Sequence, residues 1–189
     1  MHLFHLNQAK ALFPAILFTL SATHVYSRDN QSAGQVISFE YMMGTADMQG
    51  ARFGYRPNTS HQLDIPWLGQ TQIEYELAVH LFDLHGSADN EASYGAAVTP
   101  IFIKNLGTVA GKPLQLEFAI GLAYVHDRQF GGVDIGSYYQ FEDRIGLTMQ
   151  LDPASDSHLG IRYMHYSNGG LNTKNPGLDF LNLFYMRRF

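Results

Sequence analysis

The chain has 189 residues, no cysteine, 12 basic against 17 acidic residues and a formal net charge of −5. This length favours a single domain, and the lack of cysteine excludes disulfide frameworks, thiolate zinc sites and thiol nucleophiles. Only 15% of the residues are charged, whereas 46% are hydrophobic and 13% aromatic. Such a composition excludes a disordered chain and a nucleic-acid coat.

Residues 1–27 read as an export segment. They combine a weakly basic start, whose one fixed charge is Lys10, with an apolar run at residues 11–20 and modest side chains up to Ser27. The run is too short to cross a bilayer and contains a proline. We therefore predict a secretory signal peptide in residues 1–27 and a mature domain in residues 28–189, with a buried helix as the alternative for the first segment.

Beyond residue 27 the hydrophobic pattern has a period of two. Apolar residues fill every odd position from Ile73 to Leu81 and every even position from Leu114 to Tyr124. This alternation is typical of strands with one apolar face. In chain order, the predicted strands are Val36–Met43, Gly50–Tyr55, Ile73–Leu81, Tyr94–Ile103, Leu114–Tyr124, Tyr139–Leu151, His158–Ser167 and Leu178–Phe189.

The connections contain the residues that turns require. We predict turns at Asp152–Asp156 and Asn105–Pro113, which are rich in Pro, Gly, Asp and Asn. The stretch Pro57–Gly69 is long for a connection and holds Trp67, the one tryptophan of the chain. We expect a helical or interfacial segment there.

The polar faces of the strands separate a soluble barrel from a membrane barrel. They carry eight charged side chains: Arg52, Arg56, Glu74, Glu76, Glu117, Glu142, Arg144 and Arg162. In a soluble lipocalin-like binder the apolar faces enclose a ligand, whereas in a membrane barrel they contact lipid and charges can point inward. Strands of ~10 residues suffice to cross a bilayer. We therefore predict an all-β fold, an eight-stranded antiparallel transmembrane β-barrel with an interior ion-pair network.

The last strand carries a further membrane-protein feature. Leu181, Leu183 and Tyr185 alternate before the final Phe189. This ending resembles the C-terminal assembly signal of bacterial outer-membrane barrels, from which it departs at Arg187.

Three reactive residue types share the outward face near the end of the chain. Continuing the apolar alternation of the last two strands by twos places His165 and Ser167 on one outward face and Asp179 on its neighbour. Residues two apart on a strand lie ~7 Å apart at Cα, so their side chains can meet. Histidine activates a serine hydroxyl, and a carboxylate orients the histidine. The intervening Asn and Gly residues offer oxyanion donors, although an ordinary strand end and turn would have the same spacing.

A resemblance sharpens this hypothesis. The run from Arg162 to Gly170, RYMHYSNGG, followed by Asn175-Pro176-Gly177, resembles the signature of the lipid A 3-O-deacylase family of outer-membrane esterases. The motif covers roughly the last 28 residues, and a general likeness extends over the chain.

The resemblance implies an eight-stranded barrel that hydrolyses the ester-linked 3-hydroxyacyl chain at position 3 of lipid A. It implies Ser167 as nucleophile, His165 as general base and acid, and Asp179 as orienting carboxylate, where the best-known family pattern has glutamate. It also implies Asn175 and the backbone of Gly170, together with Asn168, as oxyanion or substrate contacts.

These features define the expected partners and the competing hypotheses. We expect lipid A or lipopolysaccharide as substrate, residence in the bacterial outer membrane, no cofactor, no metal and no nucleic acid; the sequence leaves monomer and homodimer open. A non-enzymatic barrel of adhesin or structural type is the alternative, but it gives no reason for ionisable residues to gather on a lipid-facing surface.

Overall fold

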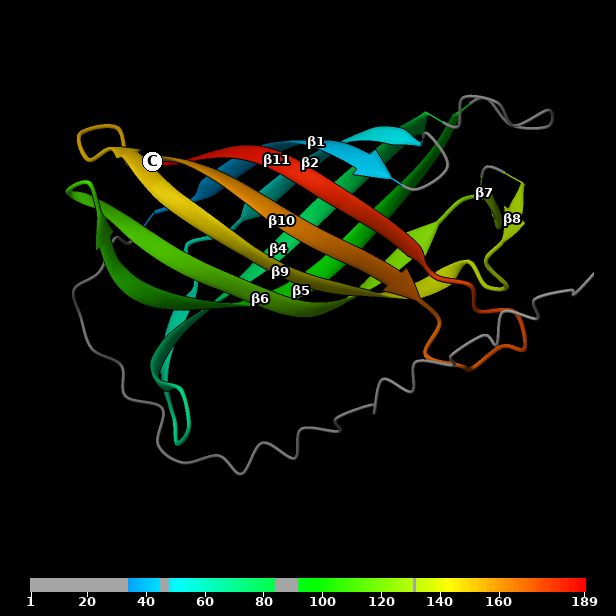
Figure 1. Cartoon of the computed structure of the whole chain (residues 1–189), viewed down its shortest axis with the longest axis horizontal. Helices are drawn as coiled ribbons and strands as arrows, with labels where there is room; N and C mark the ends of the chain where they lie inside the picture. Colours follow the sequence, from blue (N-terminus) through cyan, green and yellow to red (C-terminus); the bar gives the residue numbers. More distant parts are fainter. Residues whose placement is uncertain (1–33, 45–47, 84–91, 131) are drawn as a thin grey trace, which may run out of the picture.

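A computed structural model describes residues 34–44, 48–83, 92–130 and 132–189 (Figure 1). The predicted signal peptide, residues 1–27, lies outside the described residues. Within these ranges, no helix has the length and apolar character of a membrane span.

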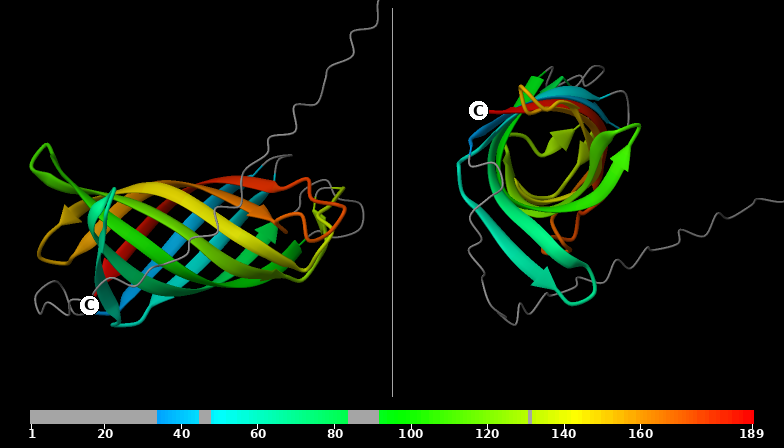
Figure 2. Two further views of the ribbon diagram at one scale, coloured as in Figure 1. Left: turned by 90° about the horizontal axis from the view of Figure 1, so that it is seen from below. Right: turned by 90° about the vertical axis from the view of Figure 1, so that its left-hand side faces the viewer.

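Eight long strands close into one antiparallel barrel (Figures 1 and 2). They are β1 (Val36–Gly44), β2 (Gln49–Arg56), β4 (Gly69–Asp83), β5 (Ala92–Val109), β6 (Lys112–Val125), β9 (Tyr139–Asp152), β10 (Ser157–Ser167) and β11 (Leu178–Arg188). The first and last strands of the barrel, β1 and β11, pair with each other and close the sheet, and β2 pairs with β4. All eight predicted strands are confirmed, as is the all-β fold.

Three short strands add to the barrel. β3 (Ser60–Ile65) pairs only with the first part of β4, while β7 (Gln129–Phe130) and β8 (Val133–Asp134) form a small separate sheet. The helical alternative for Pro57–Gly69 is therefore wrong, because β3 is an extended strand that pairs with β4 after a break at residues 57–59. The interfacial alternative stays a prediction.

The predicted turn at Asn105–Pro113 is also shorter in the structure. β5 runs to Val109 and the turn is confined to Ala110 and Gly111, which both have positive φ. The turn-type residues Asn105 and Gly107 instead lie where the β5–β6 register shifts, and the Gly107 N–H donates to Asn105 Oδ1 at 3.1 Å. A β-bulge uses the same residue types as a turn, which explains the error.

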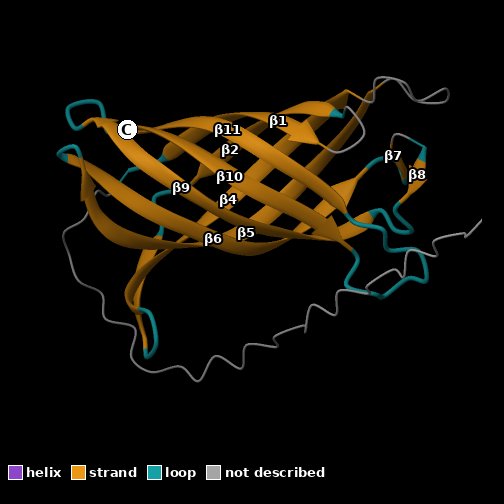
Figure 3. Ribbon diagram, viewed as in Figure 1, coloured by secondary structure: helices purple, strands orange, loops and turns teal. Residues whose placement is uncertain are grey.

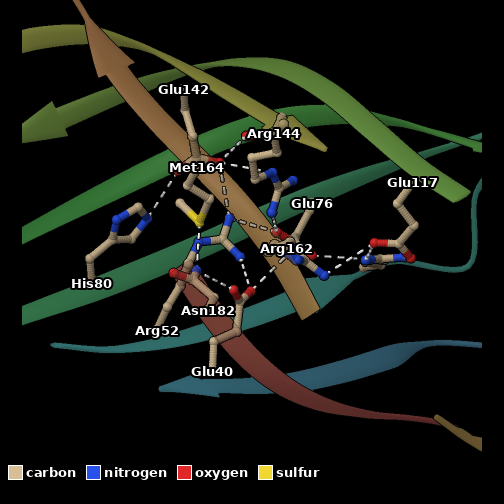
Figure 4. Close-up of polar contacts among 12 residues, drawn as sticks. Glu40, Arg52, Glu76, His80, Glu117, Glu142, Arg144, Arg162, Met164 and Asn182 are labelled. Atoms are coloured by element: carbon tan, nitrogen blue, oxygen red, sulfur yellow. Dashed lines mark hydrogen bonds and ion pairs between the residues drawn. The ribbon is translucent and has the colours of Figure 1, made fainter. Parts of the chain in front are cut away.

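The two faces of the wall differ as a membrane barrel requires. The predicted interior network is confirmed: Arg52 contacts Glu40 and Glu76 at 2.6 Å each, and Arg162 contacts Glu117 at 3.1 Å (Figure 4). All eight predicted charged residues are buried. Large apolar side chains such as those of the β4 outward face are instead half exposed on the outside. Charged residues inside the barrel and apolar residues outside it are the reverse of the arrangement in a soluble protein.

The two ends of the barrel carry different connections (Figure 3). The C-terminus and the short turns of β5–β6 and β9–β10 lie at one end. The opposite end carries β7 and β8 and the loop of residues 168–177, toward which β10 runs. The motif that the sequence singled out therefore lies at the end away from the C-terminus.

Candidate active site

His165 occupies the centre of a row of ionisable side chains that crosses three strands. On β10 it is opposite Asp179 of β11 on one side and Asp143 of β9 on the other. His165 Nδ1 and Asp179 Oδ1 are 2.7 Å apart, and 34% and 43% of the two side chains is exposed. Side chains directly opposite on antiparallel strands lie on the same face. The structure therefore brings His165 and Asp179 together on the outside of the wall.

Ser167 lies two residues further along β10, close to the end of the strand. The strand alternation places it on the same face as His165, and its side chain is half-buried. Because Nδ1 of His165 contacts Asp179, Nε2 is the ring nitrogen left to accept a proton from Ser167. Within the described residues no hydrogen bond joins the Ser167 hydroxyl to His165, and such bonds in catalytic sites commonly tighten only when substrate binds.

Tyr163 is a member of this cluster that the sequence reasoning missed. Alternation along β10 predicts Tyr163 on the outward face, where it does lie, and its hydroxyl donates a hydrogen bond of 2.5 Å to Asp179 Oδ1. The same carboxylate oxygen thus contacts both Tyr163 and His165. The available signal was the spacing of Tyr163, His165 and Ser167 by twos along one strand face. Together, these two contacts restrict the orientation of the Asp179 carboxylate.

Gly177 also contributes to the site, through a close approach to His165 that the sequence pattern does not predict. It has a φ of +76°, and a Cβ at this position would lie 2.6 Å from His165 Cε1. Only glycine combines this backbone conformation with such a close approach. The loop backbone at Gly177 therefore packs directly on the imidazole and limits its rotation.

Asn168 is buried and organises the loop that follows Ser167. Its Nδ2 donates to the carbonyls of Ile135 and Lys174, at 3.2 and 2.7 Å. Its Oδ1 accepts the Gly170 N–H at 3.0 Å. Because the amide protons of Asn168 are already donated to carbonyls, its side chain fixes the loop geometry in this arrangement.

The other two predicted oxyanion contacts differ in how they are engaged. The Gly170 N–H already donates to Asn168, so it would have to be shared with a substrate oxygen. Asn175 accepts the Asn168 N–H at 2.9 Å through Oδ1, and among the described residues its Nδ2 donates no hydrogen bond. Asn175 is also exposed, which leaves its amide as the best-placed donor of the three.

The loop is anchored to the small sheet beside it. Lys174 Nζ contacts Asp134 Oδ2 at 2.9 Å, and Asn172 Nδ2 donates to the Gly136 carbonyl at 2.8 Å. The hydrogen bond from Lys174, followed by that from the Gly136 N–H, lowers the pKa of Asp134 below its ordinary value. The carboxylate therefore keeps its charge, and this anchor persists, to a lower pH than for an ordinary aspartate.

The scattered histidines do not form a metal site in the described part of the chain. There, no group of three or more His, Asp or Glu side chains is arranged to hold a metal ion. His80 contacts Tyr166 inside the barrel, His126 stacks on Tyr94 and His158 contacts Asp156, so each has its own local surroundings.

Comparison with known proteins adds sequence relatives to this geometry. The family model described as lipid A 3-O-deacylase (PagL) matches residues 49–188. The lipid A deacylase PagL of Bordetella bronchiseptica is 30% identical over 186 residues, which cover 97% of this chain and 98% of the relative. The lipid A deacylase PagL of Pseudomonas aeruginosa is 28% identical over 181 residues, which cover 93% and 97% of the two chains.

A solved structure shares the fold. The crystal structure of the outer membrane enzyme PagL matches with a TM-score of 0.63 and 23% sequence identity, covering 80% of this chain and 97% of that chain. The match supports the closed eight-stranded barrel.

Proposed function

This chain belongs to the lipid A 3-O-deacylase (PagL) family, and on that premise we propose that Ser167, His165 and Asp179 carry out the hydrolysis as a serine esterase. Membership makes the protein a hydrolase acting on lipid A and sets aside the non-enzymatic alternative.

The proposed reaction has two steps. Ser167 Oγ attacks the ester carbonyl of the 3-O-linked acyl chain while His165 Nε2 accepts the serine proton. The tetrahedral intermediate collapses when His165 returns that proton to the departing sugar oxygen, leaving an acyl-serine. In the second step His165 takes a proton from water as the water oxygen attacks the acyl-serine carbonyl. The tetrahedral intermediate then collapses with breakage of the bond to Ser167 Oγ, which receives the proton back from His165, and the 3-hydroxy fatty acid is released. No cofactor enters this scheme.

The surrounding residues support these steps. Asp179, 2.7 Å from His165 Nδ1, holds the tautomer in which Nε2 can accept a proton and stabilises the imidazolium that forms. The Asn175 amide and the Gly170 N–H are the proposed donors to the oxyanion. Asn168 acts by holding both of them in the loop.

The position of the trio fits a substrate that is itself a membrane lipid. We place the barrel in the outer membrane with the C-terminus on the periplasmic side, so that residues 168–177 lie at the extracellular end. The outward-facing serine then lies at the level of the outer leaflet. Lipid A in that leaflet can approach sideways along the apolar wall, without entering the charged barrel interior.

One observation carries the proposal: the contact of His165 Nδ1 with Asp179 Oδ1 at 2.7 Å, on the outer face that also bears Ser167. An ion-forming pair facing lipid is costly. A wall that served only as a structural barrel would gain nothing from it.

Substitution of Ser167 tests the proposal. We expect Ser167→Ala to fold normally and to abolish removal of the 3-hydroxyacyl chain, because it deletes the attacking oxygen and little volume. Mass spectrometry of lipid A from cells expressing each variant gives the readout, with Ser137→Ala in a loop at the same end of the barrel as a matched control. Normal deacylation by folded Ser167→Ala would show that Ser167 is not the nucleophile.

A further inference from the structure

The hairpin of β3 and β4 leaves the barrel wall at the end that carries the C-terminus. β4 pairs with β5 from Asp83 back to Gln72, whereas its first residues pair with β3 alone. In Figure 1 and in the right view of Figure 2 the hairpin extends sideways, away from the barrel axis. It therefore runs along the plane in which a membrane surface would lie.

The tip of this hairpin is an apolar turn closed by a hydrogen bond. The Leu68 N–H donates to the Ile65 carbonyl at 2.9 Å, which closes a four-residue turn with Pro66 in its second position. Proline is favoured at the second position of a β-turn, because its ring fixes φ near the value that this position requires. Trp67 follows it, with 68% of its surface exposed. None of the four residues is charged. The exposed Trp67 side chain therefore lies in an uncharged turn at the tip of the β3–β4 hairpin.

Neighbouring side chains mark the level of the tip. On the outward face of β5, Phe102 stacks on Phe118 with ring centroids 4.9 Å apart, and Lys104 is the next outward residue. Lys104 Nζ donates to the Gln70 carbonyl, near the tip, at 3.1 Å. Aromatic rings followed by a lysine are typical of the boundary between hydrocarbon and water. The Lys104 hydrogen bond thus links the hairpin to the boundary of the lipid-facing wall at the end of the barrel that carries the C-terminus.

We propose that the Ile65–Leu68 tip inserts Trp67 into the headgroup region of the glycerophospholipids on the periplasmic side of the membrane. The inference rests on the membrane placement given under Proposed function, but not on the catalytic roles. Indole has an apolar body and a polar N–H, so it gains from both sides of this boundary. The polar hairpin residues Gln62, Asp64 and Gln70 remain able to contact water and headgroups.

The single tryptophan allows a direct test with the purified protein. It is reconstituted into vesicles of phosphatidylethanolamine and phosphatidylglycerol, and the emission of Trp67 is recorded with iodide in the water or with phospholipids brominated near the headgroup. We expect blue-shifted emission, loss of most of the emission with the brominated lipids, and little quenching by iodide.

Two variants that move the tryptophan calibrate the signal. Trp67→Phe/Leu77→Trp places it on the outward face of β4, where Leu77 is 55% exposed, and its quenching by brominated lipid reports that the barrel is in the bilayer. Trp67→Phe/Ala154→Trp places it in the exposed β9–β10 turn at the same end of the barrel, where iodide should quench it strongly.

The outcomes separate the possibilities. If the tryptophan at position 77 responds to brominated lipid while Trp67 responds only to iodide, the barrel is inserted and the proposal for the tip is wrong. If Trp67 is shielded from both quenchers and loses that shielding as the protein is diluted with lipid, a second copy covers the tip and the proposal is also wrong. If the tryptophan at position 77 is not quenched by lipid, the membrane placement itself fails.

Discussion

The barrel wall separates two groups of ionisable side chains. Inside, Arg52 contacts Glu40 and Glu76 at 2.6 Å each, and none of the three side chains has any exposed surface. Outside, His165 and Asp179 form a similarly close pair, at 2.7 Å, yet 34% and 43% of their side chains is exposed. Both are close charge-capable pairs, but only the outer one is accessible to another molecule.

The surroundings of each group account for this difference. Interior charges are balanced by several partners at once, as when Arg56 contacts both Glu76 and Glu117 at 3.0 Å. Such a network fills the barrel and orients the strands from within. The outer cluster is small: it consists of Ser167, His165, Tyr163 and Asp179, with Asp143 on the other neighbouring strand, and it borders an apolar wall. We infer that the inner group supports the fold and that the outer group performs the chemistry.

The largest expected effect on turnover comes from substituting His165 or Ser167. His165→Asn should lower turnover on lipid A in detergent by roughly 10⁴-fold or more, the scale on which serine triads lose activity. The double variant Ser167→Ala/His165→Asn should lose no more than either single variant, because the two residues act as one unit. Strictly multiplicative losses would mean that they act independently.

Asp179 tests the departure from the glutamate of the best-known family pattern. Asp179→Asn should lower turnover by ~10⁴-fold, because the amide no longer selects the tautomer that accepts the serine proton. Asp179→Glu should retain substantial activity. Asp143→Asn is the matched control, since Asp143 is opposite His165 on the other neighbouring strand. If the Asp143 variant loses more activity than the Asp179 variant, the orienting carboxylate has been misassigned.

The inner group should respond in the opposite way. Arg56→Met leaves Glu76 and Glu117 without one of their partners and should lower the free energy of unfolding by about 3–5 kcal/mol. Turnover of the folded protein should stay near the wild-type value, because the site lies at the other end of the barrel. Urea unfolding followed by the mobility of unboiled protein on gels measures the first quantity. A large loss of turnover at full stability would break the division between the two groups.

Among the proposed active-site substitutions, Tyr163→Phe should have the smallest effect on turnover. Tyr163→Phe removes the 2.5 Å hydrogen bond to Asp179, and hydrogen bonds to charged groups contribute about 1.5–3 kcal/mol, so a loss of turnover of at least about 10-fold is expected. The loss should vanish in the Asp179→Asn background, since the tyrosine acts through that carboxylate. An undiminished loss there would assign Tyr163 a separate role.

Much of the architecture followed from period-two alternation. Strands such as Ile73–Leu81 alternate so regularly that a shift of one residue would turn every side chain to the wrong face, which fixes orientation as well as extent. The same parity assigned Glu76 and Arg144 to the interior and His165 and Asp179 to the exterior, as the contacts confirm. The ends of elements were less predictable, because Asn and Gly serve turns and bulges equally.

The site could be predicted only as far as local spacing reaches. The spacing leaves Asp179 opposite either Ser167 or His165, depending on the register of the hairpin, and in the structure it is opposite His165. The Tyr163 contact with Asp179 depends on how far a side chain leans along the strand, and the Gly177 approach to His165 depends on the loop path. Neither follows from alternation. The nucleophile, the oxyanion donors and the signal peptide stay predictions.

Labelling with a fluorophosphonate tests the central claim most directly, because this reagent reacts with an activated serine whatever substrate the enzyme uses. The account predicts a single phosphonylated peptide that contains Ser167 in the wild-type protein, strongly reduced labelling in His165→Asn and none in Ser167→Ala. Labelling of a different serine, or full deacylase activity after complete modification of Ser167, would contradict it.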